Sequence, residues 1–379
     1  MSRAAMRVGI VGCGVVSGYY AQNASAFDSF ALVACADLDS RAAELLAAEH
    51  DFAAASVDEL IADPSVDVVL NLTPPEAHVA VIRQALRAGK HVYSEKPLAT
   101  TAAEAAKLLA EAERRDVRIG CAPDTFLAGP FQAARRLLDA GAIGEPLSVS
   151  AAMLAGGQTV WHPNPDIFFA DGAGPLLDMG PYYLTAIVSL LGPVRRVAGF
   201  ASTRVLERRI EIGPRAGEPF TAATPTHVAA VLELDGGVTA NLVASFEAGD
   251  QYVSDFEIHG SEGVLALPDP NAFEGPLRMR RGRSGWEDVP FATRGDQEAR
   301  GLGLHDLVEA LAEKRPHRAS GQLAHHVVDV GRSVLAAAAK GRTLDVRTHV
   351  DRPAAMPEPR PVPASTRRPA VLRDATTRR

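Results

Sequence analysis

The stretch VGIVGCGVVSGYY, residues 8–20, decides the fold of the first third of the chain. An apolar run leads into Gly12 and Gly14, and Ser17 stands where a third glycine would complete the pattern. The first glycine permits a tight turn, the second lets a ligand approach the backbone, and the following helix offers free N–H groups to phosphate. The motif therefore predicts a dinucleotide site. The residues expected to contact the cofactor here are Gly12, Gly14, Val15 and Val16.

An alternation of strand and helix patterns extends from this motif to residue 123. Apolar runs alternate with helical patterns, and the runs lie at residues 7–12, 31–37, 66–73, 91–94 and 117–122. Near-continuous apolar strands that alternate with helices are typical of a doubly wound parallel sheet. We therefore expect an α/β chain whose residues 1–123 form a Rossmann NAD(P)-binding domain.

The ends of the second and third strands carry further candidates for cofactor binding. Asp37 follows the glycine turn by about 20 residues, where a carboxylate binds both ribose hydroxyls and repels a 2′-phosphate. This favours NAD(H) over NADP(H), although Arg41 nearby can moderate the preference. Thr73 and Pro74 end the third strand at the same sheet edge, and His78 is a weaker candidate because it can simply begin the next helix.

Charged residues also end the strand in HVYSEKPL, residues 91–98. Glu95 and Lys96 fall at the carboxyl edge of the predicted sheet, where open parallel sheets bind ligands. Pro97 keeps Lys96 out of the helical region. Taken alone, this segment is equally compatible with a solvated surface turn.

The rhythm changes from about residue 147. Strand patterns now follow one another through turns such as DGG and GSEG, and one strong helical pattern covers residues 176–192. This predicts a C-terminal α+β domain, residues 124–346, with a large and mostly antiparallel sheet. Residues 347–379 are rich in Pro and Arg without a periodic apolar face, so we expect a flexible tail.

Composition narrows the class of protein. A net charge of -7 gives no general basic field, so neither nucleic acid nor an anionic membrane is an expected partner. The three cysteines have no zinc-site spacing, and no metal site is predicted. The sequence shows no signal peptide and no apolar run of about 18 residues. We expect a cytoplasmic protein that binds small molecules.

Several motifs in order resemble the Gfo/Idh/MocA oxidoreductase family: GIVGCGVVS, NLTPPEAH, AGKHVYSEKPLA, GPLLDMGPYYLTAIVSLLG and EIHGSEGVLALPDPN. The resemblance covers about residues 5–345. It implies hydride transfer between a nicotinamide and a secondary alcohol or ketone of a sugar, glycoside or cyclitol. It also implies that Lys96 lies beside the nicotinamide and the reacting oxygen, that Glu95 lies near the ribose, and that an open-faced C-terminal sheet forms a homo-oligomer contact, as a dimer or tetramer.

One position departs from the common pattern. Many family members place a histidine four residues after the aspartate, whereas Asp178 is followed there by Tyr182. Residues at this spacing share a helix face, although Pro181 disturbs a helix. The hypothesis is that Tyr182 transfers the proton, Lys96 favours its phenolate, and Asp178 orients one of them or a substrate hydroxyl. Alternatively, the tyrosine is a core aromatic residue.

Polar and aromatic residues outside the motifs suggest a substrate. Aromatic faces beside hydrogen-bonding groups suit a sugar ring, although each such residue alone can be structural. The candidates besides Lys96, Asp178 and Tyr182 are Asp124, Phe126, Trp161, His162, Asn164 and His227.

Two other functions remain open at this point. Some relatives retain NAD and eliminate a glycosidic substituent through a transient 3-keto sugar. A family member can also act as a non-enzymatic NAD-dependent regulator, but such a protein does not need the proton donor that Lys96, Asp178 and Tyr182 would form.

Overall fold

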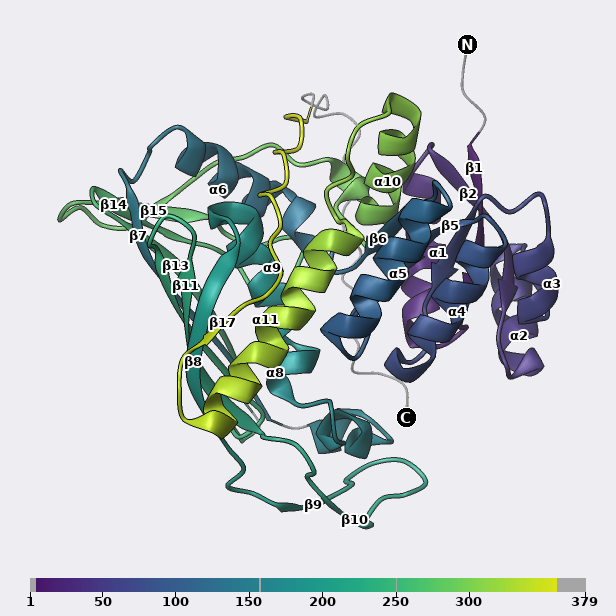
Figure 1. Cartoon of the computed structure of the whole chain (residues 1–379), viewed down its shortest axis with the longest axis horizontal. Coiled ribbons are helices and arrows are strands. Elements are labelled where there is room, and N and C mark those ends of the chain that lie inside the picture. Colours follow the sequence, from purple (N-terminus) through teal and green to yellow (C-terminus); the bar gives the residue numbers. More distant parts are fainter. Residues whose placement is uncertain (1–4, 157, 250, 360–379) are drawn as a thin grey trace.

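Six parallel strands form the sheet of the amino-terminal unit in the computed structural model, which describes residues 5–359 except 157 and 250 (Figure 1). The sheet order is β3-β2-β1-β4-β5-β6. The strands are β1 (Met6–Val11), β2 (Phe30–Ala36), β3 (Ala53–Ala55), β4 (Val68–Asn71), β5 (His91–Ser94) and β6 (Ile119–Cys121). The predicted doubly wound sheet is confirmed, and the short β3 is an addition to it.

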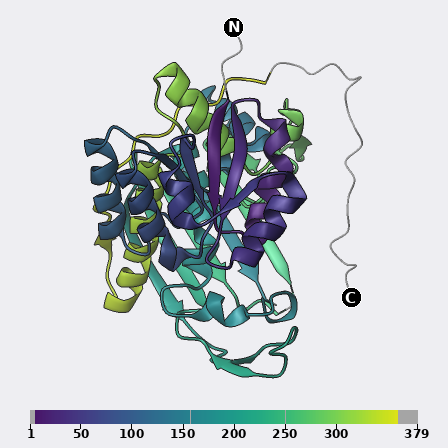
Figure 2. The same ribbon diagram turned by 90° about the vertical axis from the view of Figure 1, so that its right-hand side faces the viewer.

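Helices cover both faces of this sheet, as Figures 1 and 2 show. They are α1 (Val15–Asn23), α2 (Ser40–His50), α3 (Val57–Ala62), α4 (Pro75–Arg87) and α5 (Ala102–Arg114). Tyr20 of α1 and Leu46 of α2 belong to the same core as Val8 and Ile10, whereas α3, α4 and α5 bury their apolar faces in a separate core. Strands buried on both faces explain the continuous apolar runs.

The second unit contains a nine-stranded sheet in the order β16-β15-β14-β13-β7-β12-β11-β8-β17. Neighbouring strands are antiparallel except for the parallel pair β12 and β7, so the predicted sheet type is confirmed. The strands are β7 (Pro146–Ala155), β8 (Val194–Ser202), β11 (His227–Leu234), β12 (Thr239–Ser245), β13 (Tyr252–Gly260), β14 (Gly263–Ala266), β15 (Arg278–Arg281), β16 (Glu287–Asp288) and β17 (Leu344–Asp345). A separate hairpin pairs β9 (Glu207–Arg209) with β10 (Pro219–Thr221).

Helices pack on one face of the large sheet and separate it from the Rossmann unit (Figure 1). Those in contact with its strands are α8 (Pro175–Asp178), α9 (Gly180–Leu191) and α11 (Gly321–Lys340), and α6 (Gly129–Asp139) packs against α9. Two other helices of the second unit, α7 (Gln158–Trp161) and α10 (Leu302–Glu313), pack elsewhere. The side chains of Val228 and Ala230 point into the core on the covered face. Along each strand of the sheet, the residues that alternate with the buried ones lie on the uncovered face. Phe200 of β8 is one of them and is 84% exposed.

The end of the chain returns to the first unit. Cys121 N donates to Ala319 O (3.0 Å), and Gly120 forms a bridge with Ser320 at the start of α11. The segment around α10 and the beginning of α11 therefore packs against the edge strand β6. This arrangement places residues near 300 beside the carboxyl edge of the Rossmann sheet.

The expectation of a flexible tail over residues 347–379 is wrong for the part that the structure describes. Met356 is 8% exposed and donates its N–H to Gln132 Oε1 (2.7 Å). Arg318 donates to the carbonyl oxygens of Ala354 and Ala355, both at 2.9 Å. Backbone groups of a Pro-rich segment thus form hydrogen bonds with side chains elsewhere in the chain, and a search for apolar periodicity does not detect such bonds. Residues 360–379 lie outside the described part.

No helix among the described residues is both long and apolar enough to cross a membrane.

Candidate active site

The glycine turn has the backbone geometry that a phosphate site requires. Gly12 has φ +102°, and a Cβ placed on it would lie 2.6 Å from the carbonyl carbon of Leu72. Gly14 caps α1, which has neither a side-chain cap nor an acidic residue in its first turn. Val15, the first helical residue, is 82% exposed. The positive end of α1 therefore presents its free N–H groups, and these residues fit the pyrophosphate of a dinucleotide.

The carboxylate of Asp37 is fixed beside this turn. Its Oδ2 accepts a hydrogen bond from Cys13 N (2.7 Å), and its Oδ1 accepts one from Asp39 N (2.9 Å). The end of β2 thus brings a negative charge to the glycine turn, as the sequence predicts. Arg41 lies exposed in the first turn of α2, close along the chain.

The imidazole of His78 is buried in contacts within the protein and is not placed to bind a cofactor. It is 1% exposed, and its two ring nitrogens each lie 2.7 Å from a backbone carbonyl oxygen, one of Thr73 and the other of Pro97. The imidazole therefore connects the loop after β4 to the loop after β5. Thr73 is partly buried and donates its hydroxyl hydrogen to Asn71 (2.7 Å), and Pro74 caps α4.

Lys96 meets Asp178 and Tyr182 across the two units. Its Nζ lies 2.7 Å from both Oδ1 and the backbone oxygen of Asp178, and 5.3 Å from the centroid of the Tyr182 ring. Burial opposes the charge, but Asp178 and Tyr182 outweigh it and raise the pKa of Lys96 above its ordinary value. The lysine is therefore an ammonium ion at neutral pH.

The helix that carries the aspartate and the tyrosine is interrupted. Asp178 ends α8, Met179 separates the two helices, and Pro181 stands in the first turn of α9. A shared face on one continuous helix is thus the wrong reason for their proximity, because the proline cannot continue the hydrogen bonds of α8. Both side chains nevertheless reach Lys96.

A second ion pair lies beside the phenol oxygen of Tyr182. Glu95 is 8% exposed, and its Oε1 accepts from Tyr20 OH (3.1 Å) and lies 3.6 Å from Arg300 Nη1. Arg300 Nη2 lies 3.5 Å from the phenol oxygen of Tyr182. Arg300 and Tyr20 are not among the residues predicted from the sequence, because neither lies within the motifs that carry the resemblance.

Asp124 is a structural neighbour of this cluster. It is fully buried, and its Oδ2 accepts from Gly301 N (3.2 Å) and Gly303 N (2.9 Å), so it fixes the start of α10. Burial raises the pKa of Asp124 to about 6. Phe126 is 3% exposed within the core. Neither side chain is open to a substrate, in contrast to the expectation from sequence.

The remaining predicted substrate residues separate into two places. Trp161 is 59% exposed and packs with His162 and Phe168 at centroid distances of 5.4 and 5.5 Å. This segment lies below the Rossmann unit in Figures 1 and 2. Asn164 is exposed and accepts from Arg215 (3.3 Å).

His227 does not join them. It begins β11 and alternates with the buried Val228, so it lies on the uncovered face of the large sheet, opposite α9 and Tyr182.

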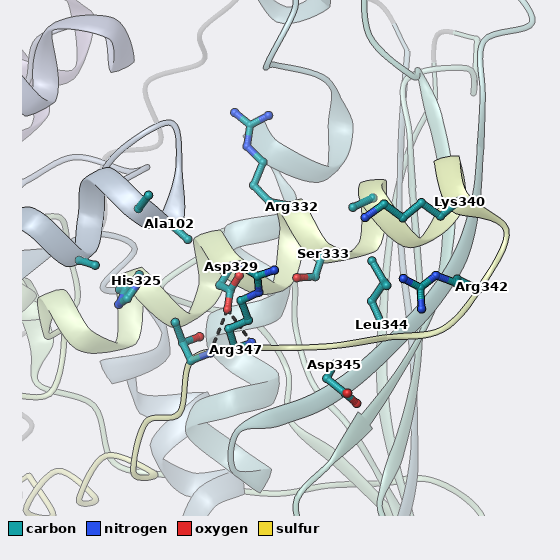
Figure 3. A pocket seen from close by; sticks show the side chains of 14 residues that line it. Ala102, His325, Asp329, Arg332, Ser333, Lys340, Arg342, Leu344, Asp345 and Arg347 are labelled. Atoms are coloured by element: carbon teal, nitrogen blue, oxygen red, sulfur yellow. Dashed lines mark hydrogen bonds between the residues drawn. The ribbon is translucent and has the colours of Figure 1, made fainter.

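An open groove lies between α5, α11 and the segment that follows α11 (Figure 3). Basic side chains line much of it, and Arg347 and Thr348 donate their N–H groups to Asp329 Oδ2 at its base. None of the residues predicted for catalysis or binding is among its described lining. The described residues also contain no group of three or more His, Cys, Asp or Glu side chains placed to hold a metal ion.

The fold and the cluster define a Rossmann-type oxidoreductase, and comparisons with known proteins agree. Residues 6–122 match the model of the "Oxidoreductase family, NAD-binding Rossmann fold", and residues 131–266 match the "GFO/IDH/MocA C-terminal domain". A dTDP-3,4-didehydro-2,6-dideoxy-alpha-D-glucose 3-reductase of Streptomyces violaceoruber is 32% identical over 87% of this chain and 90% of the relative. The chain therefore belongs to the Gfo/Idh/MocA family of NAD-binding oxidoreductases.

Two further proteins show how far the likeness extends. A trans-1,2-dihydrobenzene-1,2-diol dehydrogenase of Bos taurus is 29% identical over 70% of this chain and 75% of its own length. The crystal structure of an NAD binding oxidoreductase from Klebsiella pneumoniae has a TM-score of 0.79 at 24% identity, covering 91% of this chain and 99% of that one. This last likeness concerns the fold.

Proposed function

We propose that this oxidoreductase interconverts a secondary alcohol and a ketone on a sugar, glycoside or cyclitol, with NAD(H) as the preferred cofactor. The observation that carries the proposal is the cluster of Lys96, Asp178 and Tyr182 at the carboxyl edge of the sheet that holds the glycine turn. Sugar-related names among the relatives support the substrate class.

Each member of the cluster has a distinct task in this reaction. Tyr182 exchanges a proton with the substrate oxygen, and the Lys96 ammonium stabilises negative charge on that oxygen. Asp178 holds Lys96 through a carboxylate contact of 2.7 Å. The bound nicotinamide supplies the acceptor or donor of hydride. A limited solvent exposure of 16% for the lysine side chain strengthens these electrostatic effects.

The cofactor would be held by the groups already described at the sheet edge. The N-terminal N–H groups of α1 suit the pyrophosphate, and Asp37 suits the hydroxyls of the adenosine ribose. The same carboxylate disfavours a 2′-phosphate, which supports NAD(H) over NADP(H). For the substrate, Trp161 and His162 offer an aromatic surface with a polar edge on the segment below the Rossmann unit.

The test is nicotinamide absorbance during turnover with a panel of sugars, glycosides, cyclitols and keto sugars. We expect oxidation or reduction with at least one member of the panel, and a loss of kcat of about 10²- to 10⁴-fold in Tyr182→Phe. Tyr183→Phe is the matched control, because Tyr183 is the adjacent residue but its hydroxyl contacts Ser254 at 2.6 Å. Equal kcat in the two variants would reject the proposed proton donor.

The same panel separates the alternatives. Cleavage of a glycoside without net change in nicotinamide absorbance would indicate the recycling lyase. Tight NAD binding without any product would indicate the regulator. The relatives named above are a reductase and a dehydrogenase, and these names support neither the lyase nor the regulator.

We also propose a homo-oligomer assembled through the uncovered face of the large sheet and located in the cytoplasm. Phe200 and Val231 are 84% and 47% exposed on this face, and such apolar exposure is typical of a contact surface. The described free thiols of Cys35 and Cys121 suit a reducing compartment. Light scattering of the wild type and of Phe200→Glu tests the contact: a mass above one chain that falls in the variant supports it, and a single-chain wild type rejects it.

A further inference from the structure

The phenol oxygen of Tyr182 has a cation beside it that no motif marks. Arg300 Nη2 lies 3.5 Å from this oxygen, at the long end of the hydrogen-bond range. Lys96 instead lies over the ring, 5.3 Å from its centroid. We infer that Arg300 is a further catalytic residue, whose guanidinium stabilises the phenolate of Tyr182 during proton transfer. The inference rests on the proposed role of Tyr182 as proton donor and acceptor.

The counter-charges distinguish the two cations. Asp178 contacts the Lys96 ammonium at 2.7 Å, whereas Glu95 lies 3.6 Å from the guanidinium of Arg300. The carboxylate of Glu95 also accepts hydrogen bonds from Tyr20 OH and from Lys96 N, both at 3.1 Å. Because Coulomb attraction weakens with distance and Glu95 is shared among donors, the charge of Arg300 is offset less than that of Lys96. Arg300 is therefore the more effective neighbour for a negative phenolate.

The fold holds Arg300 at this place from both sides. Its carbonyl oxygen accepts from Asn23 Nδ2 (3.5 Å). The next residue, Gly301, has φ +112° and donates its N–H to Asp124 (3.2 Å). The Arg300 side chain is 22% exposed, so solvent screens its charge only in part. Asp124 thus acts on the site through the backbone that carries Arg300.

The guanidinium contributes charge without exchanging a proton. In the oxidative direction the O–H bond of the substrate breaks as an O–H bond forms on the Tyr182 phenolate, so negative charge moves from the phenol oxygen to the substrate oxygen. The C–H bond of the substrate would break as its hydride passes to the oxidised nicotinamide, which leaves a neutral ketone. Reduction reverses these changes. Burial opposes the charge of Arg300, but Tyr182 and Glu95 outweigh it and raise its pKa, so the side chain keeps its proton throughout.

The experiment measures the pH dependence of kcat for the oxidative direction in wild type, Arg300→Met, Arg300→Lys and Glu95→Gln. In Arg300→Met we expect the pH of half-maximal rate to rise by about one unit or more and kcat near neutral pH to fall about 10- to 100-fold. Arg300→Lys should recover part of both. Glu95→Gln should move the profile the opposite way, because it removes the counter-charge. If Arg300 had a purely structural role, the Arg300 and Glu95 variants would not shift the pH profile of kcat in opposite directions.

A second readout needs no substrate. The ultraviolet absorbance of the Tyr182 phenolate, taken as the difference from the corresponding Tyr182→Phe protein, should develop at higher pH when Arg300 is Met or Lys. This shift without turnover on any substrate would support the charge effect and refute the proposed reaction. Turnover that depends on Tyr182, with an unchanged pH profile and phenolate absorbance in Arg300→Lys, would overturn the inference and leave the proposed reaction intact. If Arg300→Met does not fold, the Lys and Glu95→Gln variants still decide.

Discussion

The amino and carboxyl edges of the Rossmann sheet each carry a largely buried lysine, but the two lysines have different roles. At the amino edge, Lys90 precedes β5 and donates from Nζ to the carbonyl oxygens of Asp63 and Val66, both at 2.6 Å. At the carboxyl edge, Lys96 follows the same strand and contacts the carboxylate of Asp178 in the other unit at 2.7 Å. Both lysines are largely buried. One joins neighbouring loops of its own unit, and the other links two units at a candidate active site.

Other residues repeat this difference. Arg7 at the amino edge donates Nε to Ser65 O (2.9 Å), which is again a bond from a side chain to local backbone. Glu95 at the carboxyl edge connects Tyr20 with Arg300, two side chains far apart in the sequence. The amino edge thus satisfies backbone groups, whereas the carboxyl edge gathers charges that a ligand or substrate can use. Variants at the two edges should therefore fail in different ways.

The largest expected effect separates the two lysines. Lys96→Met should lower kcat about 10²- to 10⁴-fold, because the charge that stabilises the reacting oxygen is lost. Lys90→Met should leave kcat within about threefold but cost about 2–4 kcal/mol of unfolding free energy, because two buried carbonyl groups lose a charged donor. Steady-state rates and urea denaturation of both variants measure this. A catalytic defect of equal size in Lys90→Met would contradict the contrast.

The glycine turn offers a second comparison, between two glycines six residues apart. Gly12→Ala should cost about 2–3 kcal/mol or more and weaken NAD binding over tenfold, because φ is +102° and the new Cβ would meet backbone atoms at 2.6–2.7 Å. Gly18→Ala is the control. Its Cβ would have nothing within 4 Å, and alanine in a helix should stabilise the protein by about 0.5–1 kcal/mol. Denaturation and NAD titration of both variants decide, and equal stability of the two would show that the turn is less constrained than its geometry indicates.

The fold was largely predictable because its signals are local. Apolar runs and glycine turns mark each strand within a few residues, so both sheets and the candidate cofactor site at Gly12 and Asp37 follow from short stretches. The described residues after 346 were not predicted correctly. Met356 and its neighbours are fixed by hydrogen bonds with the side chains of Gln132 in α6 and Arg318 in the loop before α11, and this leaves no periodic pattern in the segment itself.

The candidate catalytic cluster was predicted only in part from the sequence. Lys96, Asp178 and Tyr182 came from a resemblance between motifs, and the structure brings them together. Arg300 belongs to the same cluster, but it is 118 residues from Tyr182 and its place depends on how α10 returns to β6. His227 shows the reverse error, since its residue type suited a sugar but its position on β11 turns it to the uncovered face.

A pH experiment tests how Asp124 supports the carboxyl edge. Its pKa is about 6 in the folded protein against an ordinary value of 3.8, so the folded state binds the proton more tightly between these values. Stability therefore falls as pH rises from about 4 to about 7, by up to about 3 kcal/mol at 1.36 kcal/mol for each pKa unit. Asp124→Asn keeps an acceptor for Gly301 and Gly303 but cannot ionise. Relative to this variant, the wild type should lose stability across that range in urea titrations, and a constant difference would contradict the assignment.

The smallest expected effect concerns the choice of cofactor at Asp37. Asp37→Asn retains an oxygen that can accept from Cys13 N, which the carboxylate now binds at 2.7 Å, but removes the charge that repels a 2′-phosphate. The ratio of kcat/KM for NAD to that for NADP should therefore fall about tenfold, equivalent to about 1.4 kcal/mol. Asp37→Ser also shortens the side chain, so it should weaken NAD further while bringing NADP no additional gain. An unchanged ratio in Asp37→Asn would mean that the carboxylate acts on the glycine turn through Cys13 alone, and the carboxyl edge would then resemble the amino edge at this strand.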